Sequence, residues 1–367
     1  MNVEKLKASQ YFGKIKGMVD TAEQLRGHEK NPADVSFSEI VKETFEITPD
    51  ELLAELGIDP NIDTISNILT VSDMDVKWII PEIIRDAIYL GLRDAPIWGS
   101  ITASEQDISQ QSVTMPYINM SDAVPHKVGE GETIPLGSIS YGQKSVKTFK
   151  IGRGIKITYE IKQYVSLDVI AIFFRDFGIK LGQALDTLAI DVLINGDQAN
   201  GSESAPVIGV TTPGTKVYKD FLRIWIRAAR MGRRFNTIIG SEDSALETLD
   251  LPEFKDRKAG TTDAKLNLKT PVPSDANYYI HGNVPENQEI LLDPRYALIK
   301  YNVIPLMIES AKIVSNQTEE FYASLTTGFG KIFKDSVILL DSSVPFSTNG
   351  FPDYMDVDAF QNVTFGE

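Results

Sequence analysis

Two long strand-forming runs dominate the middle of the chain, QQSVTMPYI at 110–118 and KSVKTFKIGRGIKITYEI at 144–161. Apolar side chains alternate with lysines along the second run, as in a strand with one face in water: Phe149, Ile151, Ile155, Ile157 and Tyr159 against Lys150 and Lys156. The two runs predict a long β-hairpin over residues 104–158. Because a two-stranded ribbon is only marginally stable alone in water, this hairpin needs a surface to lie on, and a neighbouring subunit can supply one.

The tip of this hairpin, VPHKVGEGETIPLGSISYGQ at 124–143, holds four glycines and two prolines. Glycine tolerates many backbone conformations, so the part from Val128 to Gly137 is expected to be mobile and to adjust between differently curved contacts. The glycine spacing is not that of a dinucleotide-binding motif, and no helix follows to receive a phosphate. Glu130 and Glu132 are expected to be solvated acids rather than a catalytic pair. We take Val128, Glu130 and Glu132 as candidate subunit contacts.

Two groups of basic residues are further candidates for contacts. The first, which we call the basic rib, has no acid among its members: Lys144, Lys147, Lys150, Arg153 and Lys156. The second recurs at helical steps near residues 217–232: Arg223, Arg227, Arg230 and Arg234, with Arg233 beside them. This helix face either binds an anion or another subunit, or is an exposed basic face paired with neighbouring acids. Within the rib, Gly152 and Gly154 indicate a β-bulge or a twist.

The longest helix is predicted from Ser166 to Asn195, where apolar residues keep one stripe: Ile170, Phe173, Phe177, Leu181, Leu185, Leu188 and Val192. Thirty residues at ~1.5 Å each make a rod of about 45 Å. The pair Asn195-Gly196 closes it. A shorter helix is predicted over residues 78–97, beginning at Pro81 and ending before Pro96.

The first 75 residues are predicted to form an extended arm. An amphipathic helix at 3–26 precedes a stretch, 31–75, that holds eleven acidic residues and one lysine. A helix begins at TPDELLAEL, where Thr48 suits the N-cap and Glu51 the capping-box position. We expect the acids, among them Glu43, Glu46 and Glu51, to lie near basic residues of neighbouring subunits. The apolar residues of the arm are expected to supply most of the binding energy to those neighbours: Phe37, Ile40, Val41, Phe45, Leu52, Leu53 and Leu56.

The rest of the chain alternates helices and strands. A helix near 217–232, the strand NTIIG (236–240), a short helix after Ser241 and the strands at 276–281 and 288–293 predict a compact α/β domain. Three later strands, 303–309, 319–330 and 336–341, are expected to return to the long helix and the base of the hairpin.

Composition excludes several classes of function. The chain has no cysteine, which removes disulfides, thiolate catalysis and zinc–thiolate sites and fits a reducing cytoplasm. A formal charge of −15 argues against a nucleic-acid binder with a broad basic face. The three histidines have no metal-ligand spacing, and no P-loop, HExxH or nucleophile elbow is present. No signal peptide or membrane span is evident, so we expect a soluble protein with no cofactor, metal or catalytic residues.

Several segments, taken in order, resemble the major capsid proteins of tailed phages, which have the Hong Kong 97-type fold. WIIPEIIRDAI resembles the helix before that family's extended loop, and HKVGEGETIPLGSISYGQ with its return strand resembles the loop itself. DVIAIFFRDFGIKLGQALDTLAIDVLINGD resembles the spine helix, and APVIGV the entry into the axial domain. The resemblance covers roughly residues 78–345.

The resemblance implies an α+β fold with five parts. These are an N-terminal arm (1–77), a peripheral domain with the spine helix (78–103, 159–196 and 301–345), an extended loop (104–158), an axial domain (197–300) and a C-terminal tail (346–367).

It further implies hexamers and pentamers that close into an icosahedral shell around double-stranded DNA. The chain would then assemble in the host bacterial cytoplasm and end in the virion, with a portal and with decoration or scaffolding proteins as further partners. Two alternatives stay open: an encapsulin-type compartment, which shares the fold, and a cytoplasmic α/β enzyme with residues 197–300 as its catalytic domain.

Overall fold

The computed structural model describes residues 37–55, 58–59, 61–64, 79–94, 97–109, 112–118, 130–131, 133, 139–196, 204–255 and 276–355. The helix expected at 3–26, the arm residue Leu56 and the candidate contacts Val128 and Glu132 lie outside these residues. The chain divides into two compact units. The first unit comprises Met1–Pro96, Phe149–Asp186 and Asn302–Thr327, and the second comprises Ile97–Thr148, Thr187–Tyr301 and Gly328–Glu367. Helices and strands occur together in both units, which confirms the α+β class.

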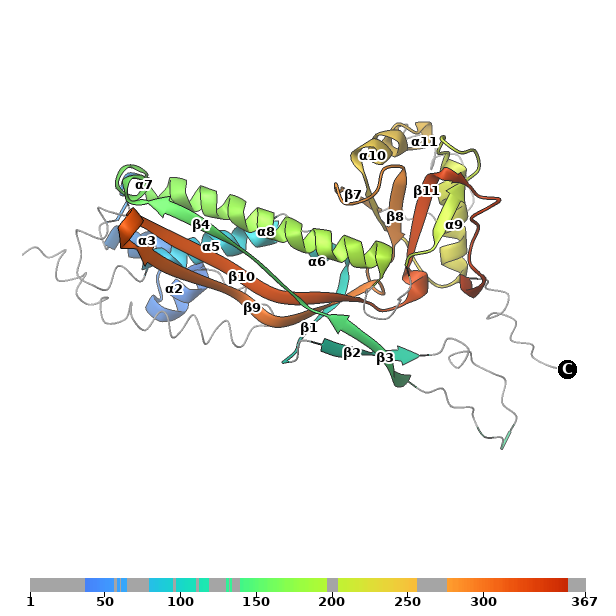
Figure 1. Ribbon diagram of the computed structural model, residues 1–367, viewed down its shortest axis with the longest axis horizontal. Coiled ribbons are helices and arrows are strands. Elements are labelled where there is room, and N and C mark those ends of the chain that lie inside the picture. Colours follow the sequence, from blue (N-terminus) through green and yellow to red (C-terminus); the bar gives the residue numbers. More distant parts are fainter. Residues whose placement is uncertain are drawn as a thin grey trace, which may run out of the picture. The chain divides into compact units, whose positions relative to one another are not determined.

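The first unit is built on the long helix α8 (Leu167–Asn195), which enters the second unit at residue 187. It lies along the strands β4 (Phe149–Thr158) and β10 (Thr318–Lys331), as Figure 1 shows. The rings of Phe174 on α8 and Phe321 on β10 meet edge to face with centroids 5.2 Å apart. The predicted apolar stripe is buried except at two positions: Leu188 is half-buried, and Phe173 is exposed while its neighbour Phe174 is buried instead.

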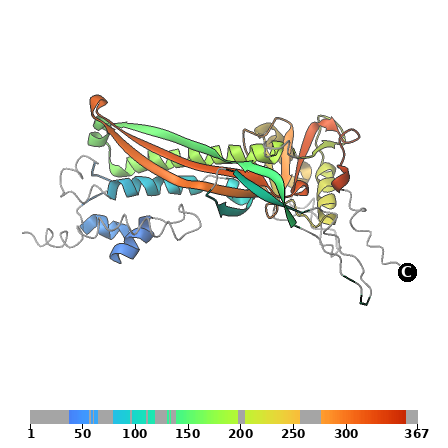
Figure 2. The same ribbon diagram turned by 60° about the horizontal axis from the view of Figure 1, so that its bottom comes forward.

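A second helix, α5 (Ile79–Asp94), packs against α8 in the same unit. Gly91 on α5 and Gly178 on α8 meet at the crossing, so the two backbones approach without intervening side chains. Figure 2 shows α5 between α8 and two shorter helices, α2 (Phe37–Phe45) and α3 (Pro49–Glu55). The capping box predicted for α3 is confirmed: Glu51 accepts a hydrogen bond from the Thr48 N–H at 2.9 Å and its own N–H donates to Thr48 Oγ1 at 3.3 Å.

The described part of the arm does not extend away from its own subunit, which corrects the sequence-based expectation. α2 packs on α3 and α5, and the N–H of Phe37 donates to Asp86 on α5 at 2.7 Å. Further along, the N–H of Leu167 donates to the carbonyl oxygen of Asp63. The apolar residues expected to bind neighbours are buried here within the chain itself: Phe37, Ile40, Val41, Phe45, Leu52 and Leu53. Because these side chains are buried within their own chain, they have no surface left to contact another subunit.

Four strands form one sheet in the order β1-β9-β10-β4, with β1 at Thr102–Asp107 and β9 at Leu298–Ile313. β4 was expected to be the return strand of the hairpin, but it pairs antiparallel with β10 of its own chain over its full length, from Thr158 to Phe149. The pairing register is unbroken, so Gly152 and Gly154 do not form a bulge. A Cβ on Gly154 would instead lie 2.7 Å from the ring of Tyr322, which covers this glycine from the opposite strand.

The second unit holds a five-stranded sheet in the order β5-β11-β8-β6-β7. Its strands are β5 (Val207–Val210), β6 (Thr237–Gly240), β7 (Asn277–Ile280), β8 (Gln288–Leu292) and β11 (Val337–Pro345). The pairs β5–β11 and β6–β7 are parallel, and β11–β8 and β8–β6 are antiparallel. β11 was expected to return to the long helix, yet it is an inner strand of this sheet with residues 337–342 all buried. Residues beyond 300 therefore complete this unit.

Three helices accompany that sheet: α9 (Tyr218–Arg230), α10 (Glu242–Leu249) and α11 (Pro252–Lys255). Phe221, Ile224 and Trp225 of α9 are buried in a core with Leu291 of β8 and Ile338 of β11. α10 begins at Ser241, whose side chain accepts a hydrogen bond from the N–H of Ser244. The short helix α6 (Trp98–Ile101) precedes β1 in this unit.

Candidate assembly surfaces

A two-stranded ribbon stands apart from both larger sheets. β2 (Ser112–Ile118) and β3 (Ile139–Lys147) pair antiparallel with each other, with an irregularity between Thr114 and Pro116. In the described residues neither strand joins another sheet. Near its base, Val146 is buried beside Tyr301 in a small apolar cluster, which fixes the ribbon to its own unit. The expected hairpin is thus shorter than 104–158, because β1 and β4 belong to the four-stranded sheet.

The tip beyond this ribbon is described only at Glu130, Gly131 and Thr133. All three are exposed, and Gly131 has a φ of +83°, a left-handed conformation that glycine adopts without strain. Glu130 is thus a solvated acid at a turn, as predicted, while contact of Val128 and Glu132 with another subunit stays a prediction.

The basic rib divides between two elements. Lys144 and Lys147 lie on β3, and Lys150, Arg153 and Lys156 lie on β4 in the four-stranded sheet. Lys147 and the three β4 residues are exposed. Alternation along β4 places Arg153 on the face that α8 covers and Lys150 and Lys156 on the opposite face. The rib therefore offers positive charge to two different surroundings rather than to one groove.

The predicted acidic contacts remain on the surface of the arm. Glu43, Glu46 and Glu51 are exposed although the apolar side of α2 and α3 is buried. Glu46 has a φ of 61° just after α2, where the chain turns toward α3. Hydrogen bonds from Thr48, that of its backbone first, lower the pKa of Glu51 below its ordinary value. These acids are open to a partner, and their contact with another subunit stays a prediction.

Arginines of α9 contact the segment of the same chain that follows β11. The guanidinium of Arg223 lies 4.0 Å above the ring of Phe346, and that of Arg227 lies 4.9 Å above the ring of Phe351. Arg227 also donates to the carbonyl oxygen of Met355 at 3.2 Å. These contacts bind the segment after β11 to α9. Of the two interpretations of this helix face, contacts within the chain fit Arg223 and Arg227 better than an anion or another subunit. Their partners differ from the expected acids: Arg223 contacts a ring as well as Asp220, and Arg227 contacts a ring and a carbonyl oxygen.

A buried polar cluster in the second unit escaped the sequence reasoning. Oε1 of Glu289 on β8 accepts hydrogen bonds from four donors: Lys216, Ser244, Thr248 and Tyr278. Glu289 is wholly buried and the Lys216 side chain is 1% exposed. Burial, and then the charge of Glu289, raise the pKa of Tyr278 far above its ordinary value. Closed to solvent, the cluster serves to fix α10 and the sheet, since a substrate cannot reach it.

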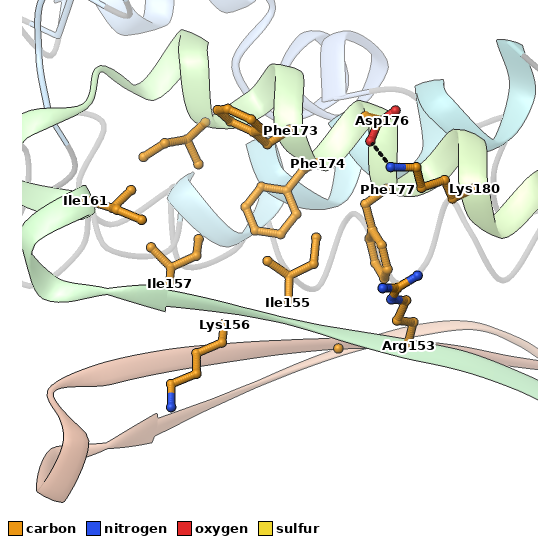
Figure 3. A pocket seen from close by; sticks show the side chains of 12 residues that line it. Arg153, Ile155, Lys156, Ile157, Ile161, Phe173, Phe174, Asp176, Phe177 and Lys180 are labelled. Carbon is orange, nitrogen blue, oxygen red and sulfur yellow. Dashed lines mark ion pairs between the residues drawn. The ribbon is translucent and has the colours of Figure 1, made fainter.

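The structure also reveals a pocket of about 390 Å³ between β4 and α8 in the first unit, which we call the α8 pocket. Figure 3 shows Phe174 and Phe177 of α8 opposite Ile155 and Ile157 of β4. Two basic side chains stand at its rim, Arg153 and Lys180, the second paired with Asp176 at 2.7 Å. Arg153 lies beside Phe177, whereas Lys156 points away from the apolar walls (Figure 3). The sequence analysis placed Phe173 in the buried stripe of the long helix, so it did not indicate this pocket. In the structure Phe173 is exposed at the pocket rim.

Metal and membrane sites were also considered. Within the described ranges, no group of three or more His, Asp or Glu side chains is arranged to hold a metal ion. Among the helices of those same ranges, none is long and apolar enough to cross a bilayer.

Comparison with known proteins finds similarity at the level of structure. No family model matches the sequence, and no curated protein matches it. The crystal structure of a virus-like particle from Pyrococcus furiosus is 11% identical, with 70% of this chain and 97% of that chain covered and a TM-score of 0.49. The capsid of an empty GTA particle is 12% identical, with 69% and 91% covered and a TM-score of 0.49. A chain from the structure of Mycobacterium phage Bobi is 10% identical, with 68% of this chain and 90% of that chain covered and a TM-score of 0.44.

Proposed function

We propose that this chain is the major capsid protein of a tailed phage. Copies of it assemble into hexamers and pentamers, and these close into an icosahedral shell around double-stranded DNA. In this proposal the chain is a structural subunit, not an enzyme. It assembles in the host bacterial cytoplasm and remains in the virion.

The observation that carries the proposal is the β2–β3 ribbon. Its two strands pair only with each other within the described residues, and Val146 at its base is buried in the subunit's own core. A two-stranded ribbon of seven and nine residues gains too little from its own pairing to be stable in water. A surface on another copy can cover it, and mutual covering by identical copies leads to a closed, symmetric assembly.

Exposed charge supports the same proposal. The arm exposes Glu43, Glu46 and Glu51, and the rib exposes Lys147 on β3 and Lys150, Arg153 and Lys156 on β4. A single exposed pair contributes only ~0.2–1 kcal/mol, so such contacts gain weight through repetition around a shell. The chain's formal charge of −15 agrees with DNA held without broad contact or sequence-specific recognition. A portal, and decoration or scaffolding proteins, complete the expected set of partners.

The test is assembly of the purified full chain, followed by size-exclusion chromatography and electron microscopy. Closed shells several tens of nanometres wide are the expected product. A variant in which a short glycine–serine turn replaces residues 114–145 removes most of the ribbon, keeps the buried Val146 and should yield folded but unassembled subunits. A full chain that stays a stable monomer at high concentration would contradict the proposal. Shells that enclose protein rather than DNA, in particles from the source, would favour an encapsulin-type compartment.

A further inference from the structure

The α8 pocket continues into an exposed apolar surface of the first unit. Phe173, at its rim, is 66% exposed, and Ile161 at its end is 42% exposed. Val169, Phe173, Asp176 and Lys180 follow one another at helical spacing along one flank of α8, and Val169 is 40% exposed. An exposed apolar surface that continues from a pocket marks an interaction site, and an extended peptide can cover both parts of it.

The charges at the pocket indicate an acidic occupant. Arg153 and Lys180 stand at the rim against the single carboxylate of Asp176, which is paired with Lys180, so the charge of Arg153 has no acid opposite it among the residues that line the pocket. Arg153 is exposed, and its side chain lies on the pocket side of β4 beside Phe177, as Figure 3 shows. A partner that fits therefore carries apolar or aromatic side chains for the walls and carboxylates for the rim.

One segment of this chain has that chemistry. Residues 356–367, DVDAFQNVTFGE, contain three acidic residues, two phenylalanines and no lysine or arginine. The other long segments outside the described residues differ: 1–36 carries six basic residues, 65–78, 119–129 and 256–275 each carry at least one lysine, and 197–203 has acids but no aromatic residue. The segment follows directly on Met355, which is buried and held by Arg227. Its starting point is therefore fixed to the second unit of the copy that carries it.

We propose that residues 356–367 of one copy dock in the α8 pocket of a second copy. Phe360 and Phe365 enter the space between β4 and α8, and the acids lie near Arg153 and Lys180. This inference rests on the proposed shell, because repetition of identical copies supplies both the segment and the pocket. It adds a second link between subunits that does not use the ribbon.

The first experiment measures binding of a labelled DVDAFQNVTFGE peptide, by fluorescence anisotropy, to the chain ending at Met355. Arg153→Glu should weaken binding by about tenfold or more, and a peptide with Phe360→Ala and Phe365→Ala should lose binding to a similar degree. Lys150→Glu is the matched control, because Lys150 lies on the same strand with its side chain on the opposite face. It should change the affinity less than threefold.

A charge exchange makes the contact specific. A peptide with Asp356→Lys and Asp358→Lys should bind the Arg153→Glu protein better than the native peptide does. Absence of peptide binding, equal losses for Arg153→Glu and Lys150→Glu, or no recovery with the exchanged peptide would each overturn the inference. Circular dichroism of each variant separates loss of binding from loss of fold.

A second experiment identifies the copy that supplies the segment. A benzoyl-phenylalanine at position 360 of the full chain, photolysed after assembly, should give covalent dimers linked within residues 153–180. Linkage within single chains alone would overturn the assignment to a second copy. Electron microscopy of the same preparations keeps the two proposals apart: shells without peptide binding contradict only the docking, and peptide binding without shells contradicts only the proposed function.

Discussion

Gly91 on α5 and Gly178 on α8 face each other where the two helices cross. A Cβ on Gly91 would lie 2.0 Å from the carbonyl oxygen of Arg175, and one on Gly178 would lie 2.1 Å from that of Ile88. Both obstacles are backbone atoms of regular helices, which cannot rotate away as a side chain can. The close crossing holds the long helix in the first unit, and only glycine permits it at both positions.

Substitution of either glycine should therefore separate the helices. We expect Gly91→Ala or Gly178→Ala to lower the free energy of unfolding by roughly 1–3 kcal/mol or more, the usual cost of overpacking. Urea unfolding followed by circular dichroism measures it. Gly99→Ala in α6 is the control, because a Cβ there meets no atom within 4 Å, and it should be neutral or slightly stabilising. A harmless Gly178→Ala would contradict the close crossing.

The buried pair of Lys216 and Glu289 gives a second prediction. Lys216→Met removes the cation and leaves the carboxylate wholly buried, so we expect a loss of roughly 3–5 kcal/mol in the free energy of unfolding. The double variant Lys216→Met with Glu289→Gln should recover part of this loss, since no charge then remains. Equal stability of the single and double variants would show that the charge on Glu289 is not the cause.

The C-terminal segment should depend on the arginines of α9. Arg227→Ala removes the contact with the Phe351 ring and the hydrogen bond to Met355. We expect a loss of about 1–2 kcal/mol and faster proteolysis within residues 346–355. Lys219→Ala, on the same helix and exposed, is the control and should leave the cleavage rate unchanged. If Arg227→Ala reduced assembly without faster cleavage, the residue would be a subunit contact instead.

Lys162 of α7 (Tyr159–Tyr164) predicts a pH dependence. Although Glu319 is its ion-pair partner, burial and then the charge of Lys312 lower the pKa of Lys162 to about 8. In the unfolded chain the pKa is about 10.4. Below pH 8 both states are protonated and the folded state bears the full cost of the buried cation. As pH rises from 8 to about 10.4 that cost disappears, so stability from this group increases by an amount on the order of 3 kcal/mol.

The measurement compares wild type with Lys162→Met at pH 7.5 and pH 10. From pH 7.5 to pH 10, the free energy of unfolding of the wild type should rise by roughly 2 kcal/mol relative to that of Lys162→Met. Lys180→Met, at an exposed position, should show no such change relative to wild type. A constant difference between wild type and Lys162→Met across this range would contradict the lowered pKa.

Charge reversal tests the contact between arm and rib. Glu43→Lys with Glu46→Lys, or Lys150→Glu with Lys156→Glu, should lower the yield of shells at low salt and much less at 0.5 M salt, where exposed charges are screened. Combining both pairs of changes should restore assembly if the two surfaces meet between subunits. Deletion of residues 1–64, by contrast, should destabilise the subunit itself, because it removes the buried Ile40 and Leu52.

Sequence alone determined the elements whose cause is local. Thr48 and Glu51 cap α3, Gly196 ends α8 with a φ of +75°, and the apolar period fixes the length of α8, because each depends on residues a few positions apart. Exposure of Glu130 at a turn followed for the same reason.

Tertiary structure decided what depends on partners far along the chain. Nothing local to β4 indicates that it pairs with β10 rather than continuing the hairpin, and nothing local to β11 places it between β5 and β8. The same holds for the arm, whose apolar residues could bury on any apolar surface and do so on their own α5. The α8 pocket exists only because β4 returns to its own sheet and brings Ile155 and Arg153 against α8. Hydrophobic burial has no direction of its own, so a pattern of apolar residues specifies that a face is covered, and the packed fold specifies by what.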